Sequence, residues 1–252
     1  MKLKYFLVPL LFLTLCPIAQ AKVKRYNVKV VAEYQHDDKA YTQGLFFHNG
    51  SLYESTGLHG ISSLRRVELE SGKVLESRKL ARKYFGEGSV ALDGKIYLLT
   101  WQNNVAFIYD ADSLRYEKAY SYPRDGWGLT TDGKQLIASD GTSSIYFLSP
   151  EFQLTKTLKV TLDGRPLRLL NELEWIDGKI WANVYTTDMI VIINPSDGKV
   201  ESIIDCTGLL PDSLRSQDTD VLNGIAVNED GRIFLTGKNW PRLYEITLTE
   251  AR

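Results

Sequence analysis

Short apolar stretches separated by tight turns recur along most of this chain. Five segments follow one plan: a polar or aromatic residue, then Gly or Glu, an apolar run, a turn and a second apolar run. They read QGLFFHNGSLYESTG, EGSVALDGKIYLLTW, WGLTTDGKQLIASDG, NELEWIDGKIWANVY and NGIAVNEDGRIFLTGK. Their turns are Asn49-Gly50, Asp93-Gly94, Asp132-Gly133, Asp177-Gly178 and Asp230-Gly231. Asn-Gly and Asp-Gly accept the positive φ angles of tight hairpins, so each segment is predicted to form two antiparallel strands.

Each hairpin is followed by a further pair of apolar runs with a turn at its middle, such as LRRVELESGKVLESRKL. A unit is therefore four short strands, and it recurs at roughly the 40–50-residue period of propeller blades. The fifth unit is one strand short, and the run Tyr26–Gln35 precedes the first unit. We expect this N-terminal strand to close the last blade, because closure removes an exposed sheet edge. The pattern predicts an all-β fold, a five-bladed β-propeller with four-stranded blades over residues 22–252, with a turn or short helix in the longer connection at 209–221.

The repeat also predicts which residues surround the mouth of the propeller. The first strand of each blade lines the central channel, and the end of the antiparallel second strand lies beside its start. The first ring of residues is Gln43, Glu87, Trp127, Asn171 and Asn223, and the second ring is Gly57, Trp101, Gly141, Tyr185 and Lys238. A few polar groups on an aromatic wall are typical of a small-ligand site. Turning the chain would not by itself require Glu, Trp and Lys at these positions.

Charge and the N-terminal segment bear on partners and on the compartment. The 252 residues carry a formal net charge of -1 with no long run of one sign, which gives no indication of nucleic-acid binding. Two lysines precede the apolar run Tyr5–Cys16, and an A-x-A cleavage site ends at Ala21. This is the pattern of a secretory signal peptide over residues 1–21, so we expect a periplasmic or secreted protein without membrane attachment after cleavage. A lipid anchor on Cys16 is the alternative, although Leu15 is not the small residue that such a signal needs.

The residue types present disfavour several chemistries. His36, His48 and His59 show no zinc-ligand spacing, and no Ser or Cys nucleophile stands beside a His. Glu87 is the only carboxylate in the two rings, whereas glycoside hydrolysis normally uses a pair and a calcium-dependent lactonase uses several. After cleavage Cys206 stands alone, so an intramolecular disulfide is impossible. A single general acid/base with carboxamide and ammonium helpers remains.

Eight short motifs in the same regions resemble the glutaminyl cyclases of plants and bacteria, the papaya type. They are YTQGL, YFGEG, LLTW, DGWGLTTDG, LNELEW, IWANVY, VLNGIA and TGKNWP, and they extend from about Tyr41 to Ile246. The resemblance implies a metal-independent five-bladed propeller with no cofactor. It implies a glutaminyl-peptide cyclotransferase, which converts the N-terminal glutamine of peptides or proteins to pyroglutamate and releases ammonia. We expect a monomer.

The resemblance also implies roles for individual residues. Glu87 of YFGEG matches the catalytic acid/base, and Gln43, Asn171 and Lys238 match substrate-binding positions. The matching aromatic wall comprises Phe85, Trp101 and Trp127. Two substrate-binding positions depart from the family, because Tyr41 stands where Phe is frequent and Tyr185 where Trp is frequent. Both keep an aromatic ring, so the pocket is expected to survive with altered size and polarity.

Two other functions fit the same mouth. A non-catalytic propeller could hold a peptide or a sugar there, because the fold alone does not decide function. A lactonase-like hydrolase would need a cation site, for which the two rings lack carboxylates. The charge of Glu87 is also left open, since burial among tryptophans would raise its pKa and a neighbouring Lys238 would lower it.

Overall fold

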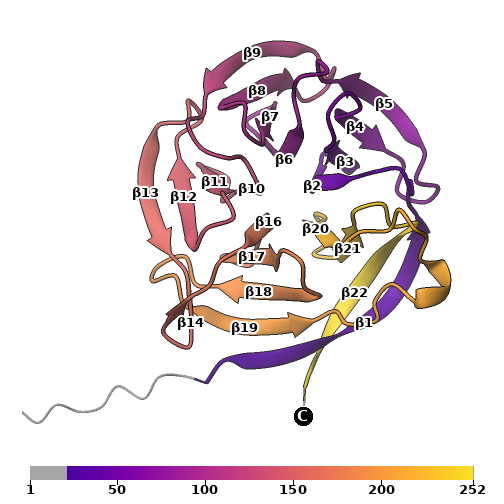
Figure 1. Ribbon diagram of the computed structural model, residues 1–252, viewed down its shortest axis with the longest axis vertical. Helices are drawn as coiled ribbons and strands as arrows, with labels where there is room; N and C mark the ends of the chain where they lie inside the picture. The colour runs from indigo at the N-terminus through magenta and orange to yellow at the C-terminus, as the bar shows by residue number, and fades with distance from the viewer. Residues whose placement is uncertain (1–21, 252) are drawn as a thin grey trace, which may run out of the picture.

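The computed structural model describes residues 22–251, and these form five blades of mostly antiparallel strands arranged around a common axis (Figure 1). The first blade comprises β2 (Thr42–His48), β3 (Ser51–Thr56), β4 (Ser63–Val67) and β5 (Val74–Lys79). The second comprises β6 (Gly86–Leu92), β7 (Lys95–Thr100), β8 (Val105–Asp110) and β9 (Tyr116–Ser121). The third comprises β10 (Leu129–Thr131), β11 (Leu136–Ser139), β12 (Ser144–Leu148) and β13 (Leu154–Lys159). The predicted propeller with four-stranded blades is confirmed.

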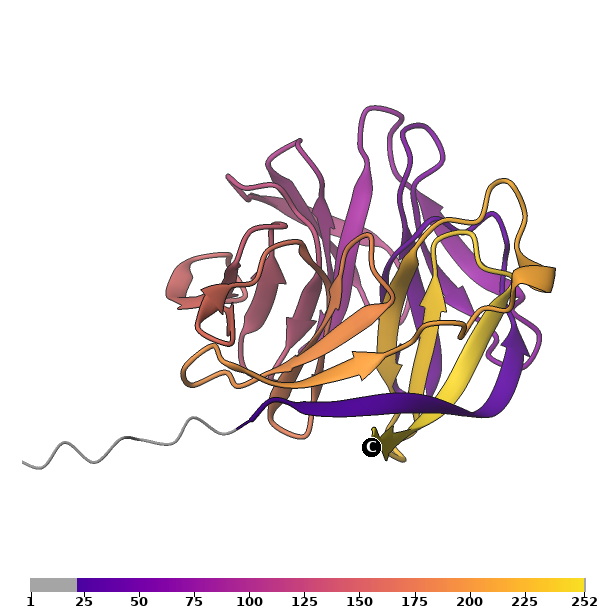
Figure 2. The same cartoon turned by 60° about the horizontal axis from the view of Figure 1, so that its bottom comes forward.

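The last two blades are joined through the N-terminal strand. Blade four comprises β16 (Leu170–Ile176), β17 (Lys179–Val184), β18 (Met189–Ile193) and β19 (Val200–Asp205). Blade five comprises β20 (Leu222–Val227), β21 (Ile233–Gly237), β22 (Arg242–Glu250) and β1 (Lys24–Gln35). As predicted, β1 supplies the missing outer strand by pairing antiparallel with β22. Its first residues also pair in parallel with β19, so blades four and five form one continuous sheet in which β1 lies between β19 and β22 (Figure 2).

Two small elements lie between blades. The hairpin β14 (Thr161–Leu162) and β15 (Arg165–Pro166) precedes blade four and was not predicted. The connection at 209–221 contains the short 3-10 helix η1 (Asp212–Leu214), in agreement with the expected turn or short helix. Among the described residues, no helix has the length and apolar character needed to span a membrane. The predicted signal peptide, residues 1–21, lies outside the described residues.

The hairpin turns follow from their sequence. At Asn49-Gly50, Asp93-Gly94 and Asp177-Gly178 both residues have positive φ, the geometry that matches the twist of the flanking strands. In the corresponding turns of blades three and five, Asp132-Gly133 and Asp230-Gly231, only the glycine has a positive φ. Local dipeptide chemistry therefore fixes the inner hairpin of every blade.

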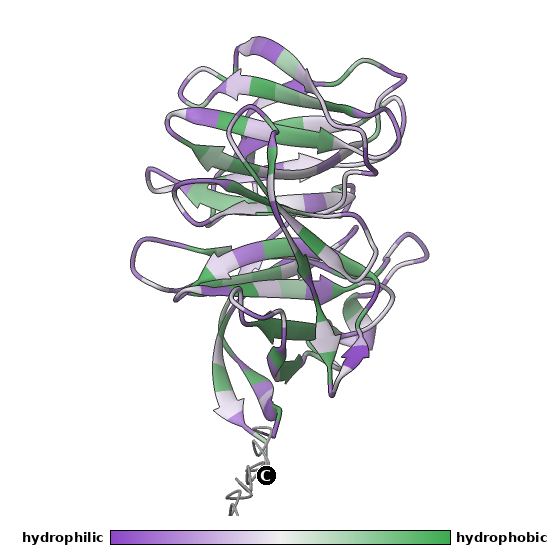
Figure 3. Ribbon diagram, turned by 90° about the vertical axis from the view of Figure 1, so that its left-hand side faces the viewer, coloured by the Kyte–Doolittle hydropathy of each residue, from purple (hydrophilic) through white to green (hydrophobic). Residues whose placement is uncertain are grey.

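The apolar core is divided among the five blade interfaces. Each of five buried clusters combines side chains from two neighbouring blades, and together they complete the circle. Figure 3 shows the corresponding hydrophobic stretches along the strands, with more hydrophilic residues in the loops. Cys206 belongs to the cluster between blades four and five, where burial raises the pKa of its thiol. Because each cluster holds only two blades together, the ring as a whole depends on its closure.

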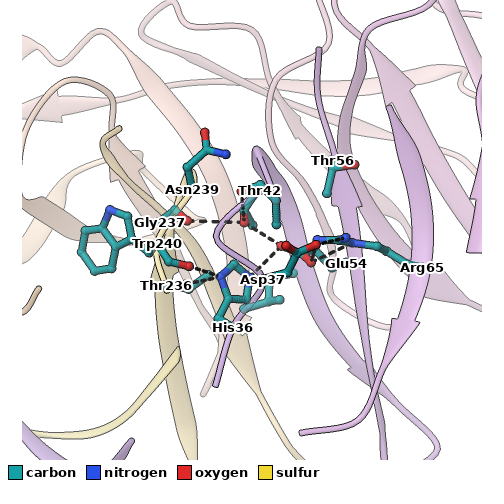
Figure 4. A network of polar contacts seen from close by, with 12 residues as sticks. His36, Asp37, Thr42, Glu54, Thr56, Arg65, Thr236, Gly237, Asn239 and Trp240 are labelled. Carbon is teal, nitrogen blue, oxygen red and sulfur yellow. Dashed lines mark hydrogen bonds and ion pairs between the residues drawn. The ribbon is translucent and has the colours of Figure 1, made fainter. Parts of the chain in front are cut away.

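A buried polar cluster reinforces the closure between blades five and one (Figure 4). His36 directly follows β1, and its Nε2 lies 3.0 Å from Glu54 Oε1 while its Nδ1 lies 2.6 Å from the carbonyl oxygen of Trp240. Arg65 donates to Glu54 Oε2 at 2.7 and 3.1 Å, and Thr42 Oγ1 donates to Glu54 Oε1 at 2.6 Å. Both ring nitrogens of His36 thus face acceptors, an arrangement that requires the doubly protonated imidazolium.

The charges in this cluster support one another. Burial alone would raise the pKa of Glu54, but Arg65 and His36 outweigh it and hold that pKa well below its ordinary value. Burial alone would lower the pKa of His36, but Glu54 outweighs it and the pKa is raised. The ionised forms are therefore the stable ones across the closure.

Removing the carboxylate should weaken the closed ring. We expect Glu54→Gln to lower the free energy of unfolding by about 3 kcal/mol, because it leaves buried positive charge without a counter-ion. Urea unfolding of residues 22–252 measures the change. The matched control is Glu201→Gln, which removes a surface ion pair with Lys179 and should cost less than about 1 kcal/mol. Equal losses in the two variants would contradict a special role for Glu54.

Candidate functional site

One cavity of about 210 Å³ opens at the mouth of the propeller. Its lining comprises Tyr41, Gln43, Phe85, Glu87, Trp101, Trp127, Asn171, Tyr185 and Lys238. These are all nine of the predicted site residues, and they come from all five blades. The structure thus brings the nine together, and their individual roles remain predictions.

Irregular pairing near the start of the inner strands helps to present the polar side chains. In blades one, two, four and five, the pairing between the first and second strands shifts register beside the first-ring residue. Gln43 lies between paired Thr42 and Gly44, and Glu87 lies between paired Gly86 and Ser89. A β-bulge re-aims side chains and interrupts the strict alternation of a strand. The polar ring is therefore a product of these bulges rather than of regular pleating.

Glu87 is almost fully buried in this cavity. Its side chain accepts a hydrogen bond from Gln43 Nε2, with 3.3 Å between the nitrogen and Oε1. Gln43 Oε1 in turn accepts from Asn223 Nδ2 at 3.4 Å. Burial raises the pKa of Glu87 well above its ordinary value, Lys238 opposes this shift and Asp125 adds to it. Of the two effects that the sequence left open, burial is the larger.

Lys238 is held by two aromatic rings. Its Nζ lies 4.9 Å from the ring centroid of Tyr41 and 4.7 Å from that of Tyr185, which are cation–π distances. Burial lowers the pKa of Lys238, whereas Glu87 and Asp220 act to raise it. The ammonium group thus sits at an aromatic wall of the cavity, where it can serve as a hydrogen-bond donor.

Two buried polar atoms of the lining lack partners. Asn171 Oδ1 and Trp127 Nε1 have no hydrogen-bond partner among residues 22–251. A buried polar atom without a partner costs free energy comparable to a lost hydrogen bond. An acceptor and a donor are thereby left for a ligand that carries both kinds of group, as a primary amide does.

The two glycines of the second ring make room for the aromatic wall. A Cβ atom at Gly57 would lie 2.4 Å from Phe85, and one at Gly141 would lie 2.6 Å from the indole of Trp127. Neither distance is sterically possible without displacing the ring. The glycines therefore allow the aromatic rings to pack directly against the backbone.

Besides the two glycines, one predicted ring position does not line the cavity. Asn223 does not line the cavity, because it lies behind Gln43 and donates to the carbonyl oxygen of Thr42 at 2.9 Å as well as to Gln43 Oε1. It therefore orients a lining residue. Register alone could not distinguish a residue that faces the cavity from one that supports its neighbour.

Sequence reasoning missed three carboxylates near the site. On β16, Glu172 accepts backbone N–H bonds from Leu45 of β2 and Ile225 of β20, and Glu174 accepts one from Val227 of β20. Burial raises the pKa of both, to about 8 for Glu174. Glu172 occupies the repeat position at which the other copies have Gly, a signal that was visible in the alignment. Asp220, which accepts a hydrogen bond from Tyr41 at 2.9 Å, lies in an irregular connection and gave no such signal.

No group of three or more His, Cys, Asp or Glu in residues 22–251 is placed to hold a metal ion.

Comparisons with known proteins support the resemblance that the motifs indicated. A profile of the family described as glutamine cyclotransferase matches residues 7–248. The glutaminyl-peptide cyclotransferase of Arabidopsis thaliana is 45% identical over 231 residues, which cover 89% of this chain and 72% of the plant protein. The crystal structure of Myxococcus xanthus glutaminyl cyclase matches with a TM-score of 0.85 and 36% identity, over 92% of this chain and 100% of the other. The chain therefore belongs to the glutamine cyclotransferase family.

Proposed function

We propose that this protein is a glutaminyl-peptide cyclotransferase in which Glu87 is the single proton shuttle. Its substrates are peptides or proteins that begin with glutamine, and its products are the pyroglutamyl peptide and ammonia. Family membership supports the reaction. The observation that carries the mechanism is one buried carboxyl group in an aromatic cavity, beside a carboxamide and opposite an ammonium group.

The reaction is a ring closure within one residue. The α-amine nitrogen attacks the side-chain amide carbon, a five-membered lactam forms, and the C–N bond to the leaving nitrogen breaks. Because both reacting groups belong to one molecule, the enzyme gains most by fixing the ring-closing rotamer. Walls formed by Phe85, Trp101 and Trp127 would hold the methylene stem of the substrate and exclude water.

Proton transfer is the remaining requirement. The amine must lose one proton as the new bond forms, and the leaving nitrogen must gain one to depart as ammonia. The carboxylate of Glu87 takes the first proton as general base and returns it as general acid, so the group ends as it began. The raised pKa of Glu87 favours this role, since an acid/base works best when its pKa lies near the working pH.

The polar groups around Glu87 would orient and polarise the substrate amide. Lys238 presents positive charge to the amide oxygen, on which negative charge develops during attack. Asn171 Oδ1 can accept a hydrogen bond from the nitrogen of the substrate amide. Trp127 Nε1 can donate a hydrogen bond to an acceptor atom of the substrate. Gln43, tied to both Glu87 and Asn223, would fix the carboxyl group in place.

We also propose that the mature chain acts outside the cytoplasm, in the periplasm or the medium, and as a monomer. The compartment rests on the signal-peptide pattern of residues 1–21.

Replacing the proton shuttle should abolish turnover without unfolding the protein. We expect Glu87→Gln to lower kcat for a Gln-initiated dipeptide by about 10²–10⁴-fold, measured as ammonia release. The matched control is Glu174→Gln. Glu174 is a buried carboxyl that binds Thr130 and does not line the cavity, so this variant should keep near-wild-type turnover. Wild-type turnover in folded Glu87→Gln would contradict the role of Glu87. Peptide binding without ammonia release by the wild type would instead favour the non-catalytic binding propeller.

Removing the charge of Lys238 should change the pH dependence as well as the rate. The ammonium group favours the carboxylate of Glu87, so its loss raises the pKa of Glu87 further. In Lys238→Met we expect kcat to fall about 10²–10³-fold and the acidic limb of the kcat–pH profile to move to higher pH. A slower variant whose acidic limb stays in place would contradict the coupling between the two groups.

Metal removal should leave the activity intact, because the proposed proton and charge roles all belong to side chains. We expect full ammonia release after prolonged dialysis against a chelator. Loss of activity that added zinc restores would refute the metal-independent mechanism.

A further inference from the structure

Asp220 is fixed to the back of the cavity wall by hydrogen bonds on several sides. Its Oδ2 accepts from the Tyr41 hydroxyl at 2.9 Å, and its Oδ1 accepts from the backbone N–H of Val221 at 2.8 Å. Its own N–H donates to the carbonyl oxygen of Lys238 at 3.0 Å, and its carbonyl oxygen accepts from Trp240 Nε1 at 2.9 Å. Asp220 is thus tied both to the backbone that carries Lys238 and to one ring of the wall.

The place of the Lys238 ammonium depends on that ring. The side chain is only 3% exposed, and its Nζ packs over the faces of Tyr41 and Tyr185. Cation–π attraction is strongest when the cation is desolvated, so these two rings decide where the charge sits. A shift of the Tyr41 ring would move the ammonium relative to Glu87.

We propose that Asp220 is a positioning residue, whose carboxylate anchors the Tyr41 ring beside Lys238 and whose charge keeps Lys238 protonated. The proposal rests on the proposed function only for the catalytic use of that ammonium. It also gives a purpose to Tyr41, since a phenylalanine at this position would have no hydroxyl to bond to Asp220.

Four ionisable side chains from different segments contact the Lys238 ammonium or act on it through their charge. Glu87 comes from β6, Tyr41 precedes β2, Tyr185 follows β17, and Asp220 precedes β20. Burial raises the pKa of both tyrosines, so they stay neutral through the working range. Charge support for Lys238 therefore comes from Glu87 and Asp220, and of these two only Asp220 lies outside the proton transfer.

The test measures the charge of Lys238 without requiring turnover. In protein labelled with ¹³C-lysine, the Cε resonance of Lys238 is assigned by its absence in Lys238→Met and followed as a function of pH. We expect Lys238 to titrate about one pH unit lower in Asp220→Asn than in the wild type, because a nearby opposite charge has been removed. The matched control is Asp218→Asn, two residues away, whose partner is the exposed Lys39 and which should leave the titration unchanged.

Activity measurements then separate this proposal from the proposed function. In Asp220→Asn, the alkaline limb of the profile of kcat/KM against pH should move to lower pH, by the same amount as the titration of the Lys238 resonance. In Tyr41→Phe the limb should stay in place while kcat falls about tenfold, since the charge of Asp220 remains but the ring loses its anchor. An unchanged Lys238 titration in folded Asp220→Asn overturns the proposal. A shifted titration with an unmoved alkaline limb supports Asp220 but contradicts the catalytic use of Lys238.

A second variant guards against loss of folding. The backbone bonds of Asp220 to Lys238 and Trp240 do not involve its carboxylate, so Asp220→Asn is expected to fold. If thermal unfolding shows otherwise, Asp220→Ser removes the same charge with a smaller side chain and should produce the same downward shift. No shift in that variant would likewise overturn the proposal.

Discussion

Closure of the ring between blades five and one is the constraint on which the other features of the molecule depend. Five separate apolar clusters hold the blades together in pairs, and none of them spans the whole ring. Strand β1 completes the circle by pairing with β22, and the chain then turns inward through His36 to begin blade one. The buried ion cluster around Glu54 lies at this turn (Figure 4). This charged, hydrogen-bonded cluster tolerates little displacement, because any shift leaves a buried charge without its partner.

The alignment of the site residues depends on this closure between blades five and one. Gln43 and Lys238 lie on opposite sides of the closure, one just inside blade one and the other at the end of β21. Backbone contacts cross between them, since the N–H of Asn239 donates to the carbonyl oxygen of Ala40 and Asn223 donates to that of Thr42. Fixing blade five against blade one therefore also fixes the distance between the side-chain amide of Gln43, which binds Glu87, and the ammonium group of Lys238.

Burial gives the mouth its reactivity. It raises the pKa of Glu87 and lowers that of Lys238, so both groups move toward the range in which protons are exchanged near neutrality. The aromatic rings that cause this desolvation pack directly against glycines. The same residues therefore determine both the shape of the cavity and the pKa shifts within it. Asp220 and Asn223, one step behind the walls, orient the lining residues through hydrogen bonds.

The sequence by itself determined the blade number, the closing N-terminal strand and the nine lining residues, in part through family motifs. These features follow from local chemistry: Asp-Gly and Asn-Gly turns, the apolar runs on either side of them and a constant repeat register. Only the tertiary structure decided that Asn223 supports the site from behind, that Glu172 reaches across to β2 and β20, and that burial outweighs Lys238 at Glu87. Only the folded chain places Asp220 against Tyr41, 179 positions away in the sequence. Bulges shift the strand pairing at the ring residues, which a repeat alignment does not reveal, and desolvation and long-range hydrogen bonds exist only once the ring has closed.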